Sequence, residues 1–389
     1  MTSRERLLAV LGGEQPDRVS VNCYELVAYD QQSWYNQRAS YKPLMDMVRE
    51  KTDCVFMASL PAPPFGNAAD AVRGVESQLP RGKKITTKKR REGKTLFIET
   101  TYHTPKGELK SSHRIDDDIF TVWTLEHMLK SIDDIDKYLS FDWAGANEFD
   151  LTEFAAVQTQ LGENGIMMPS LSDAIGEVGE LFELGRFLVL SITETARIKY
   201  FLDFIHQRQI AYLEKLMEAG ADAGVNWAEC LFRICGPEYA TLPYLSPEYF
   251  AMFVTPYVKR MSDILHQYGA KVRLHCHGKL GKVLDEIMKT EPDGLDPIEP
   301  PPDGDIELGQ VKKQTGGRVC LFGNIEMRLL EHGEPEEVRD FVIDALAQAK
   351  KGGRFVIMPT AAPINDPLSQ KTQENYAVFI ETALEHGRY

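Results

Sequence analysis

The chain has 389 residues, of which 43% are hydrophobic and 26% charged, as in an ordinary globular protein. Its formal net charge is -14. A diffuse acidic surface repels phosphate backbones and anionic lipids, so we expect neither nucleic-acid nor membrane binding. No apolar run approaches the roughly 20 residues that a membrane-spanning helix needs.

The cysteines and the first residues indicate a reducing compartment. The six cysteines are scattered without a CxxC pair, and a chain of this length buries enough surface to fold without disulfides. The opening MTSRERLLAVLGG is a charged amphipathic pattern that lacks the apolar core of a signal peptide. We therefore expect a cytoplasmic protein. We also expect one domain over residues 1–389, because α/β barrels with insertions reach this size.

The N-terminal half predicts three separated strands and an inserted sheet. The strands are expected at 18–24, 53–59 and 165–171. Residues 84–115 alternate as antiparallel strands do, which predicts a β-meander inserted in the fold, with the basic run Lys88–Arg91 at a solvated hairpin tip or in a docking patch. Proline and glycine predict loops at 61–70 and 296–305.

The C-terminal half repeats one unit five times, an amphipathic helix followed by a turn and a short apolar strand. The five predicted strands are ADAGVNW, AKVRLHCHG, DGLDPIEP, RVCLFGN and RFVIMPT. Alternation at this spacing implies parallel strands joined by right-handed crossovers. Since no GxGxxG follows an early strand, a dinucleotide-binding sheet is disfavoured, and the pattern predicts a (β/α)₈ TIM barrel.

Polar residues stand where these five strands end. They are Glu229, then His275 and His277, then Asp296 and Glu299, then Asn324, and finally Thr360. The carboxyl ends of barrel strands converge on one mouth, so we expect these side chains to line a pocket there.

His275 and His277 are the strongest candidates for a metal site. Residues i and i+2 of a strand point to the same side, so both imidazoles could bind one divalent ion such as Zn²⁺. The alternative is a pair of hydrogen-bonded histidines without metal. HxH also occurs in metal-dependent amidohydrolases, but the later ligands of those enzymes are missing here. A third ligand is needed, and the candidates by position are Glu229, Glu238, Glu299 and Cys320.

Two further residues are candidates for catalysis. Glu238 lies in a loop held by Pro237 and Pro243, where a carboxylate could be a metal ligand or a general acid, or simply face solvent. Asn324 could donate a hydrogen bond to a substrate oxygen, or form a turn. Cys320 stands within a strand, which favours a small buried hydrophobe.

Several segments together resemble the uroporphyrinogen decarboxylase superfamily, in particular its cobalamin- and coenzyme M-type methyltransferases. They are SRERLLAVLGGEQPDRVSV, TPKGEL, LSPEYFAMFVTPYVKRM, HCHG and GRVCLFGNIE. The resemblance implies a barrel and a homodimer. True decarboxylases of the family carry RQAGR after the first strand and a late GHG-like motif; this chain reads VNCYELVAYD and MPTAAP at those places.

The methyltransferase branch binds zinc through His-x-Cys and a late Cys. By that resemblance His275 matches the histidine, His277 stands where the first Cys would be, and the late Cys falls near Thr360. The resemblance therefore implies a ligand set of nitrogen and oxygen, with Glu238 as the missing ligand.

The function that these observations favour is metal-dependent methyl transfer between a small thiol or methyl ether and a corrinoid. The corrinoid would sit on a partner protein, because the chain has no DxHxxG signature of its own. Glu238 or Glu229 would handle a proton, and Asn324 would orient the substrate. One alternative is a porphyrinogen decarboxylase, which needs cations such as Arg233, Arg273 or Arg354. Another is a corrinoid-binding protein without catalysis.

Overall fold

The computed structural model describes residues 1–61, 85–141, 143 and 149–389. The loop expected at 61–70 lies outside this part of the chain, apart from its first residue. No helix within the described ranges is long and apolar enough to cross a membrane.

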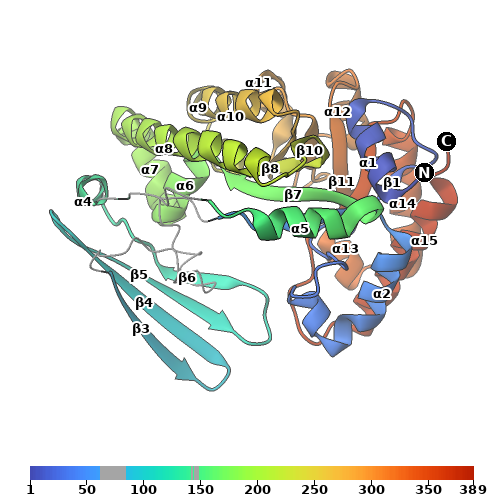
Figure 1. Ribbon diagram of the computed structural model, residues 1–389, viewed down its shortest axis with the longest axis horizontal. Helices are drawn as coiled ribbons and strands as arrows, with labels where there is room; N and C mark the ends of the chain where they lie inside the picture. The colour runs from blue at the N-terminus through green and yellow to red at the C-terminus, as the bar shows by residue number, and fades with distance from the viewer. Residues whose placement is uncertain (62–84, 142, 144–148) are drawn as a thin grey trace.

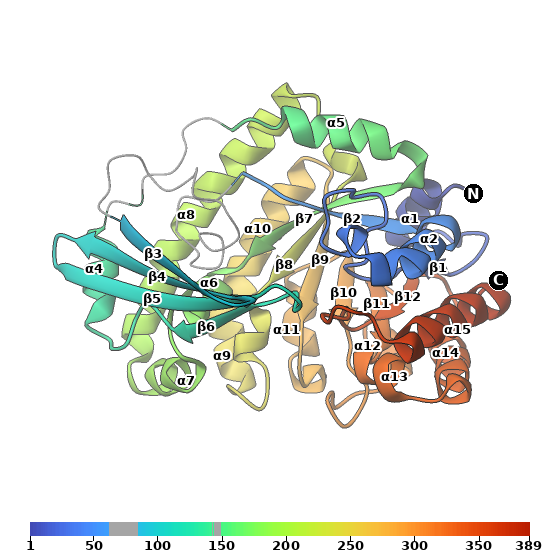
Figure 2. The same cartoon turned by 90° about the horizontal axis from the view of Figure 1, so that it is seen from below.

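The centre of the molecule is a curled sheet of eight strands in the order β1-β12-β11-β10-β9-β8-β7-β2 (Figures 1 and 2). Each neighbouring pair in this order is parallel. The strands are β1 (Ser20–Val21), β2 (Cys54–Ala58), β7 (Gly165–Ser172), β8 (Leu231–Cys235), β9 (Lys271–Cys276), β10 (Gly294–Pro297), β11 (Cys320–Ile325) and β12 (Phe355–Pro359).

The two outer strands of this order, β1 and β2, meet and complete the ring. The backbone amide of Asp53, just before β2, donates to the carbonyl of Val21 at 2.7 Å. The Asn22 side chain adds a bond from Nδ2 to the Asp53 carbonyl at 3.0 Å. The predicted (β/α)₈ barrel is therefore confirmed, with all but one of the five predicted C-terminal strands in place.

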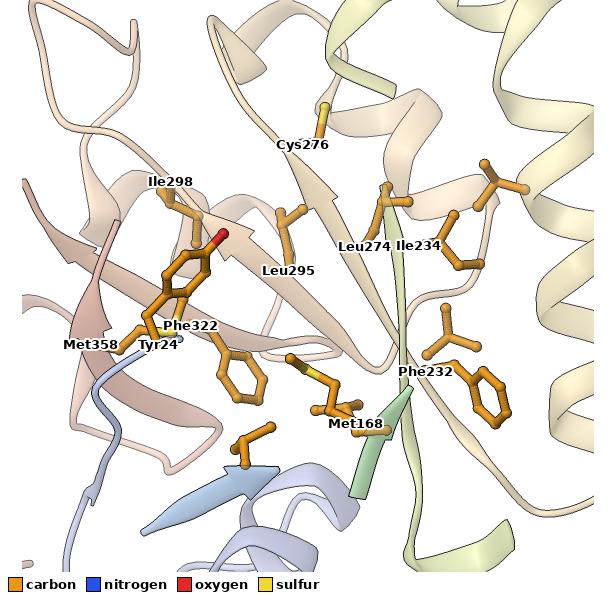
Figure 3. Packing of buried hydrophobic residues seen from close by; sticks show 14 of the residues in the cluster. Tyr24, Met168, Phe232, Ile234, Leu274, Cys276, Leu295, Ile298, Phe322 and Met358 are labelled. Carbon is orange, nitrogen blue, oxygen red and sulfur yellow. The ribbon is translucent and has the colours of Figure 1, made fainter. Parts of the chain in front are cut away.

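Helices surround the sheet and shield its apolar outer face (Figures 1 and 2). Figure 3 shows part of the buried cluster, in which neighbouring strands contribute Phe232, Leu274 and Leu295. The helices are α1 (Ser3–Gly12), α2 (Lys42–Lys51), α4 (Asp134–Ser140), α5 (Thr152–Leu161), α6 (Ala174–Leu181), α7 (Leu184–Thr193), α8 (Thr195–Asp222), α9 (Pro247–Phe253), α10 (Thr255–Gln267), α11 (Leu284–Lys289), α12 (Leu308–Gln314), α13 (Met327–His332), α14 (Pro335–Ala349) and α15 (Gln370–His386).

The first of the five predicted C-terminal strands, ADAGVNW, is wrong. Helix α8 continues to Asp222, and the strand begins only at Leu231. The apolar residues Val225 and Trp227 are buried, and the Trp227 indole donates to the Met217 carbonyl of α8 at 3.0 Å. Their hydrophobicity reflects packing under the helix and not a strand.

The predicted β-meander is confirmed and has one strand more than expected. It consists of β3 (Ile85–Glu92), β4 (Thr95–Thr104), β5 (Gly107–Asp116) and β6 (Val122–Glu126), all antiparallel. The basic run Lys88–Arg91 lies within β3 and not at a hairpin tip. Its side chains are exposed, and Arg91 pairs with Asp117 at 2.9 Å.

The turn between β5 and β6 attaches the meander to the barrel. The Phe120 ring stacks on Trp34, with ring centroids 5.2 Å apart. The Phe120 amide donates to the Ile364 carbonyl at 2.8 Å. Trp34 and Ile364 belong to the segments that follow β1 and β12, so the meander rests on loops at the carboxyl ends of the strands (Figure 2).

Candidate functional site

His275 and His277 come together at the end of β9. Their rings meet edge to face, with centroids 4.6 Å apart and planes at 88°. Cys276, between them, is fully buried in the hydrophobic core. The i, i+2 spacing therefore places both imidazoles on one side of the strand, as expected from its pleat.

A buried carboxylate fixes the orientation of His275. Asp296, on the adjacent strand β10, lies 2.7 Å from the His275 Nδ1 and receives two bonds of 2.6 Å from Arg273. Burial opposes the charged form of Asp296, but Arg273 and His275 outweigh it and hold its pKa far below the usual range. Burial and the nearby Arg233 lower the pKa of His275 to about 3. His275 is therefore neutral, with Nδ1–H donating to Asp296 and the lone pair on Nε2.

His277 is held in the same way by a second carboxylate. Glu299 Oε1 accepts a hydrogen bond from His277 Nδ1, and its Oε2 accepts from the Gly278 amide at 3.2 Å. Burial works against the protonated form, but the bond to Glu299 raises the pKa of His277 above its usual value. Gly278 has φ 96°, and a Cβ there would stand 2.7 Å from Thr241 Oγ1. Glycine is thus required for the turn and for the close approach of the next loop.

Glu238 lies in that next loop, in the 3₁₀ turn Pro237–Ala240 after β8. Thr241 Oγ1 stands 2.9 Å from the Glu238 carbonyl and 3.0 Å from the His277 carbonyl, which pins the loop to the end of β9. The Glu238 carboxylate accepts from the Gly236 amide at 3.1 Å. Burial raises the pKa of Glu238, against the opposing influence of His277, so this half-buried carboxyl can hold a proton beside the histidine pair.

The donor set fits a divalent metal in chemical type at two positions. A metal-binding histidine commonly donates its second ring nitrogen to a carboxylate, and both histidines do so here. Each Nε2 is left without a hydrogen-bond partner in the parts of the chain described. Across those ranges no three His, Cys, Asp or Glu side chains converge closely enough to hold an ion, so a third ligand is not in place.

Asn324 lies on β11, within the same mouth. It is 3% exposed, and its Oδ1 has no hydrogen-bond partner in the described structure. The preceding Gly323 passes so close to Pro297 that a Cβ would stand 2.2 Å from the Pro297 carbonyl oxygen. Thr360 follows β12, and its amide donates to the Ile325 carbonyl at 2.8 Å. The unpartnered Oδ1 of Asn324 is therefore available to accept a hydrogen bond from a ligand.

Two sequence-predicted candidates lie at the opposite end of the barrel. Glu229 precedes β8 and pairs with Arg4 of α1 at 3.1 Å. Cys320 begins β11 and is fully buried there. The error for Glu229 follows from the misplaced strand, because a residue expected after a strand in fact precedes one. We therefore assign neither residue to the site.

The sequence did not single out Tyr24 or Asp173, and placed Arg233 only as a cation for decarboxylation. Arg233 of β8 donates from Nη2 to the Tyr24 hydroxyl. Asp173, after β7, is fully buried, and its Oδ2 has no partner among the described residues. The sequence does mark Arg233, because it is the charged residue in the otherwise apolar segment Leu231–Cys235.

Comparison with known proteins agrees with this architecture. The chain is 26% identical over 169 residues to "Methylcobamide:CoM methyltransferase MtaA" of Methanosarcina barkeri, a stretch that covers 43% of this chain and 45% of that protein. The chain is thus matched to less than half the length of this curated relative. A solved structure described as a methyltransferase from Methanosarcina mazei superposes with a TM-score of 0.59 at 16% identity, covering 99% of both chains, and supports the fold.

The family assignment rests on a sequence profile. The profile described as "Uroporphyrinogen decarboxylase (URO-D)" matches residues 181–385, which is more than half of the chain and includes His275, His277 and Asn324. This agrees with the resemblance in the motifs, and the curated relative is named as a methyltransferase. The chain belongs to the uroporphyrinogen decarboxylase family.

Proposed function

We propose that this chain is a methyltransferase that moves a methyl group between a small thiol or methyl ether and a corrinoid. The observation that carries the proposal is the histidine pair, with one carboxylate on each Nδ1, at the mouth of a URO-D-type barrel. The relative named methylcobamide:CoM methyltransferase supports the reaction class. A separate protein would present the corrinoid.

We further propose that His275, His277 and Glu238 hold a divalent metal, with zinc the first candidate. The metal would act as a Lewis acid on the thiol sulfur or ether oxygen of the substrate. Glu238 would join the histidines by a side-chain movement within the loop that Thr241 pins to β9. Asp296 and Glu299 hold the two imidazole rings in orientation, as carboxylates bound to the second ring nitrogen of metal-binding histidines commonly do.

When Glu238 is not bound to the metal, it would hold and donate the proton that the reaction needs. When a methyl group leaves an ether oxygen, that oxygen must gain a proton, and burial keeps a proton on Glu238 at higher pH than usual. Asn324 Nδ2 would then donate to the substrate oxygen, and its unpartnered Oδ1 would accept from the hydroxyl that forms. The meander, attached through Phe120 to two mouth loops, would restrict water at the site.

The arginines weigh against a porphyrinogen decarboxylase. Arg273 is neutralised by both oxygens of Asp296, and Arg354 donates to the carbonyls of Leu11 and Gly12 at the other end of the barrel. Of the three arginines that sequence indicated, only Arg233 faces the mouth without an acid partner. One guanidinium does not match the several carboxylates of a porphyrinogen.

The test combines elemental analysis with a methyl-transfer assay on free methylcobalamin. We expect about one divalent metal per chain in the wild type, and loss of both metal and transfer in His275→Ala and His277→Ala. Cys276→Ala is the matched control, because this residue lies between the histidines but is buried in the hydrophobic core. The control should keep its metal and its activity.

Three results would contradict the proposal. Metal content that is unchanged in both histidine variants would remove the metal site. Release of CO₂ from a porphyrinogen by the wild type would favour the decarboxylase. Tight corrinoid binding that is independent of His275, with no transfer to thiols or methyl ethers, would favour a binding protein without catalysis.

A further inference from the structure

Arg233 is a partly buried cation that is not paired with an acid. It forms no ion pair with any carboxylate of residues 1–61, 85–141, 143 or 149–389. Its single hydrogen bond in these ranges runs from Nη2 to the Tyr24 hydroxyl, and its Nε is buried without an acceptor. Burial opposes the charge, but Cys235, Tyr24 and Asp296 nearby raise its pKa, so the guanidinium stays protonated.

The neighbouring Arg273 shows what a structurally satisfied arginine looks like in the same barrel. The two residues lie side by side in the register of β8 and β9. Arg273 is 0% exposed and gives two bonds of 2.6 Å to the oxygens of Asp296. Arg233 is only partly buried, and its guanidinium lies against Tyr24, which follows β1 at the mouth. Arg273 is therefore satisfied by Asp296 within the fold, whereas Arg233 keeps hydrogen-bond donors that an anionic ligand could use.

The position of Arg233 places such an anion beside the histidine pair. The Arg233 guanidinium lies 5.2 Å from the centroid of the Tyr24 ring, and that ring lies 6.2 Å from the ring of His275. Arg233 also stands near enough to His275 to lower its pKa. A ligand held by Arg233 would therefore present the rest of its structure to His275 and His277.

We infer that the site binds a substrate with a carboxylate head group, which Arg233 holds while the reacting end lies at His275 and His277. The Nε–H and Nη N–H groups form a planar fork, which matches the two oxygens of a carboxylate. The Tyr24 hydroxyl fixes one side of that fork in advance. The inference rests on the proposed function only in naming the bound molecule a substrate.

The experiment measures binding of three matched probes by titration calorimetry. They are 3-methoxybenzoate, 3-methoxybenzenesulfonate and 3-methoxybenzyl alcohol, which differ only in the head group. We expect wild-type protein to bind the carboxylate about ten- to a hundredfold more tightly than the alcohol, as for hydrogen bonds to a charged group. In Arg233→Met the two should bind equally.

Three further variants separate the effect from loss of folding. Arg186→Met removes an exposed arginine of α7 and should keep the wild-type preference. Arg233→Lys keeps the charge without the fork, and Tyr24→Phe frees the guanidinium from its only partner in the described ranges, so each should keep a reduced preference. These two variants carry the test should circular dichroism show that Arg233→Met is unfolded.

The inference is overturned if the wild type shows no preference for the carboxylate, or if the preference survives in Arg233→Met. Equal affinity for sulfonate and carboxylate would overturn the carboxylate assignment in favour of oxyanions in general. Because the titrations contain no corrinoid, binding is measured independently of methyl transfer. An Arg233-dependent preference in a protein that transfers no methyl group would leave this inference standing and remove the proposed function.

Discussion

Both ends of the barrel contain buried charged side chains, but the two ends differ in how completely these side chains are hydrogen-bonded. At the amino ends of β1 and β2, Asp53 is 1% exposed and receives Arg6 at 2.6 Å, Arg18 at 2.8 Å and the Val21 amide at 3.0 Å. At the mouth, several buried polar atoms have no partner in the described structure. They are Arg233 Nε, Asp173 Oδ2, Asn324 Oδ1 and Glu326 Oε1.

This difference separates residues that stabilise the fold from residues that are available to a ligand. A buried ion pair with every bond made contributes to the native state, and removing one partner leaves an uncompensated charge. An unpartnered polar atom costs stability in the absence of a ligand and persists where another constraint requires it. Barrels place stability at the amino end and chemistry at the carboxyl end of their strands, and the partners of Asp53 at one end and the unpartnered atoms at the other are consistent with that division.

The largest effect is expected at the closed end. Asp53→Ala leaves Arg6 and Arg18 without their shared acceptor, so the free energy of unfolding should fall by about 3–5 kcal/mol. Urea denaturation measures the loss, with Asp46→Ala of the exposed surface of α2 as control at about 0.5 kcal/mol or less. Metal content should not change. If Asp53→Ala lowers the free energy of unfolding by less than about 1 kcal/mol, the stabilising role assigned to the amino end is wrong.

A change of opposite sign is expected at the mouth. Burial raises the pKa of Asp173 well above its usual value, and its Oδ2 is unpartnered. Asp173→Asn keeps the cap on the Gly176 amide, which now lies 2.8 Å from Oδ1, and removes the cost of a buried acid. The variant should be more stable than wild type by about 1–3 kcal/mol at neutral pH.

The pH dependence of this gain gives the sign a second check. The folded protein holds the Asp173 proton to higher pH than the unfolded chain does, so wild-type stability falls as pH rises above the unfolded pKa. The gain of Asp173→Asn should therefore be present at neutral pH and vanish as pH falls toward the unfolded value. A variant less stable than wild type at every pH would show that Asp173 is a structural acid.

The smallest effect on stability, and the sharpest on the site, is expected for Glu299→Gln. His277 has a raised pKa because of Glu299, so the variant should titrate at lower pH than wild type, while His275 stays neutral to about pH 3 in both. The stabilising part of this bond is present below the unfolded pKa of histidine and is lost as pH rises through the folded one. Metal affinity should fall about 10- to 100-fold.

Nitrogen-15 spectra of the metal-free protein, labelled at histidine, follow both rings. Glu248→Gln, an exposed glutamate of α9, is the control and should leave both titrations unchanged. A His277 that titrates alike in wild type and Glu299→Gln would mean that the Glu299 bond does not govern its charge.

The sequence predicted the barrel because helix and strand alternate with clear periodicity from α8 onward. It predicted that His275 and His277 share a side, since the pleat of a strand fixes this from spacing alone. The prediction from sequence was wrong where apolar residues are buried under a helix and do not form a strand. Val225 and Trp227 are apolar because they pack under α8, and reading them as a strand moved Glu229 to the wrong end of the barrel.

The partners of the histidines depend on register between strands, which sequence does not contain. Asp296 reaches His275 because β9 and β10 pair these two residues directly. Arg233 is a further example, since an arginine in a strand is more often exposed than buried. Its contact with Tyr24 joins residues 209 positions apart. Only the closed ring of strands brings them together.

The short strand β1 has a consequence for how the barrel moves. β1 has two residues, and the Val21 amide bonds to the Asp53 side chain and not to the backbone of β2. One backbone bond joins Asp53 to Val21, whereas β9 and β10 pair over four residues. Hydrogen–deuterium exchange should therefore be fastest, among the strands of the ring, at the amides of Val21 and Asp53. We expect transient separation of the wall to begin at this seam, which leaves the pairing of β9 with β10 intact.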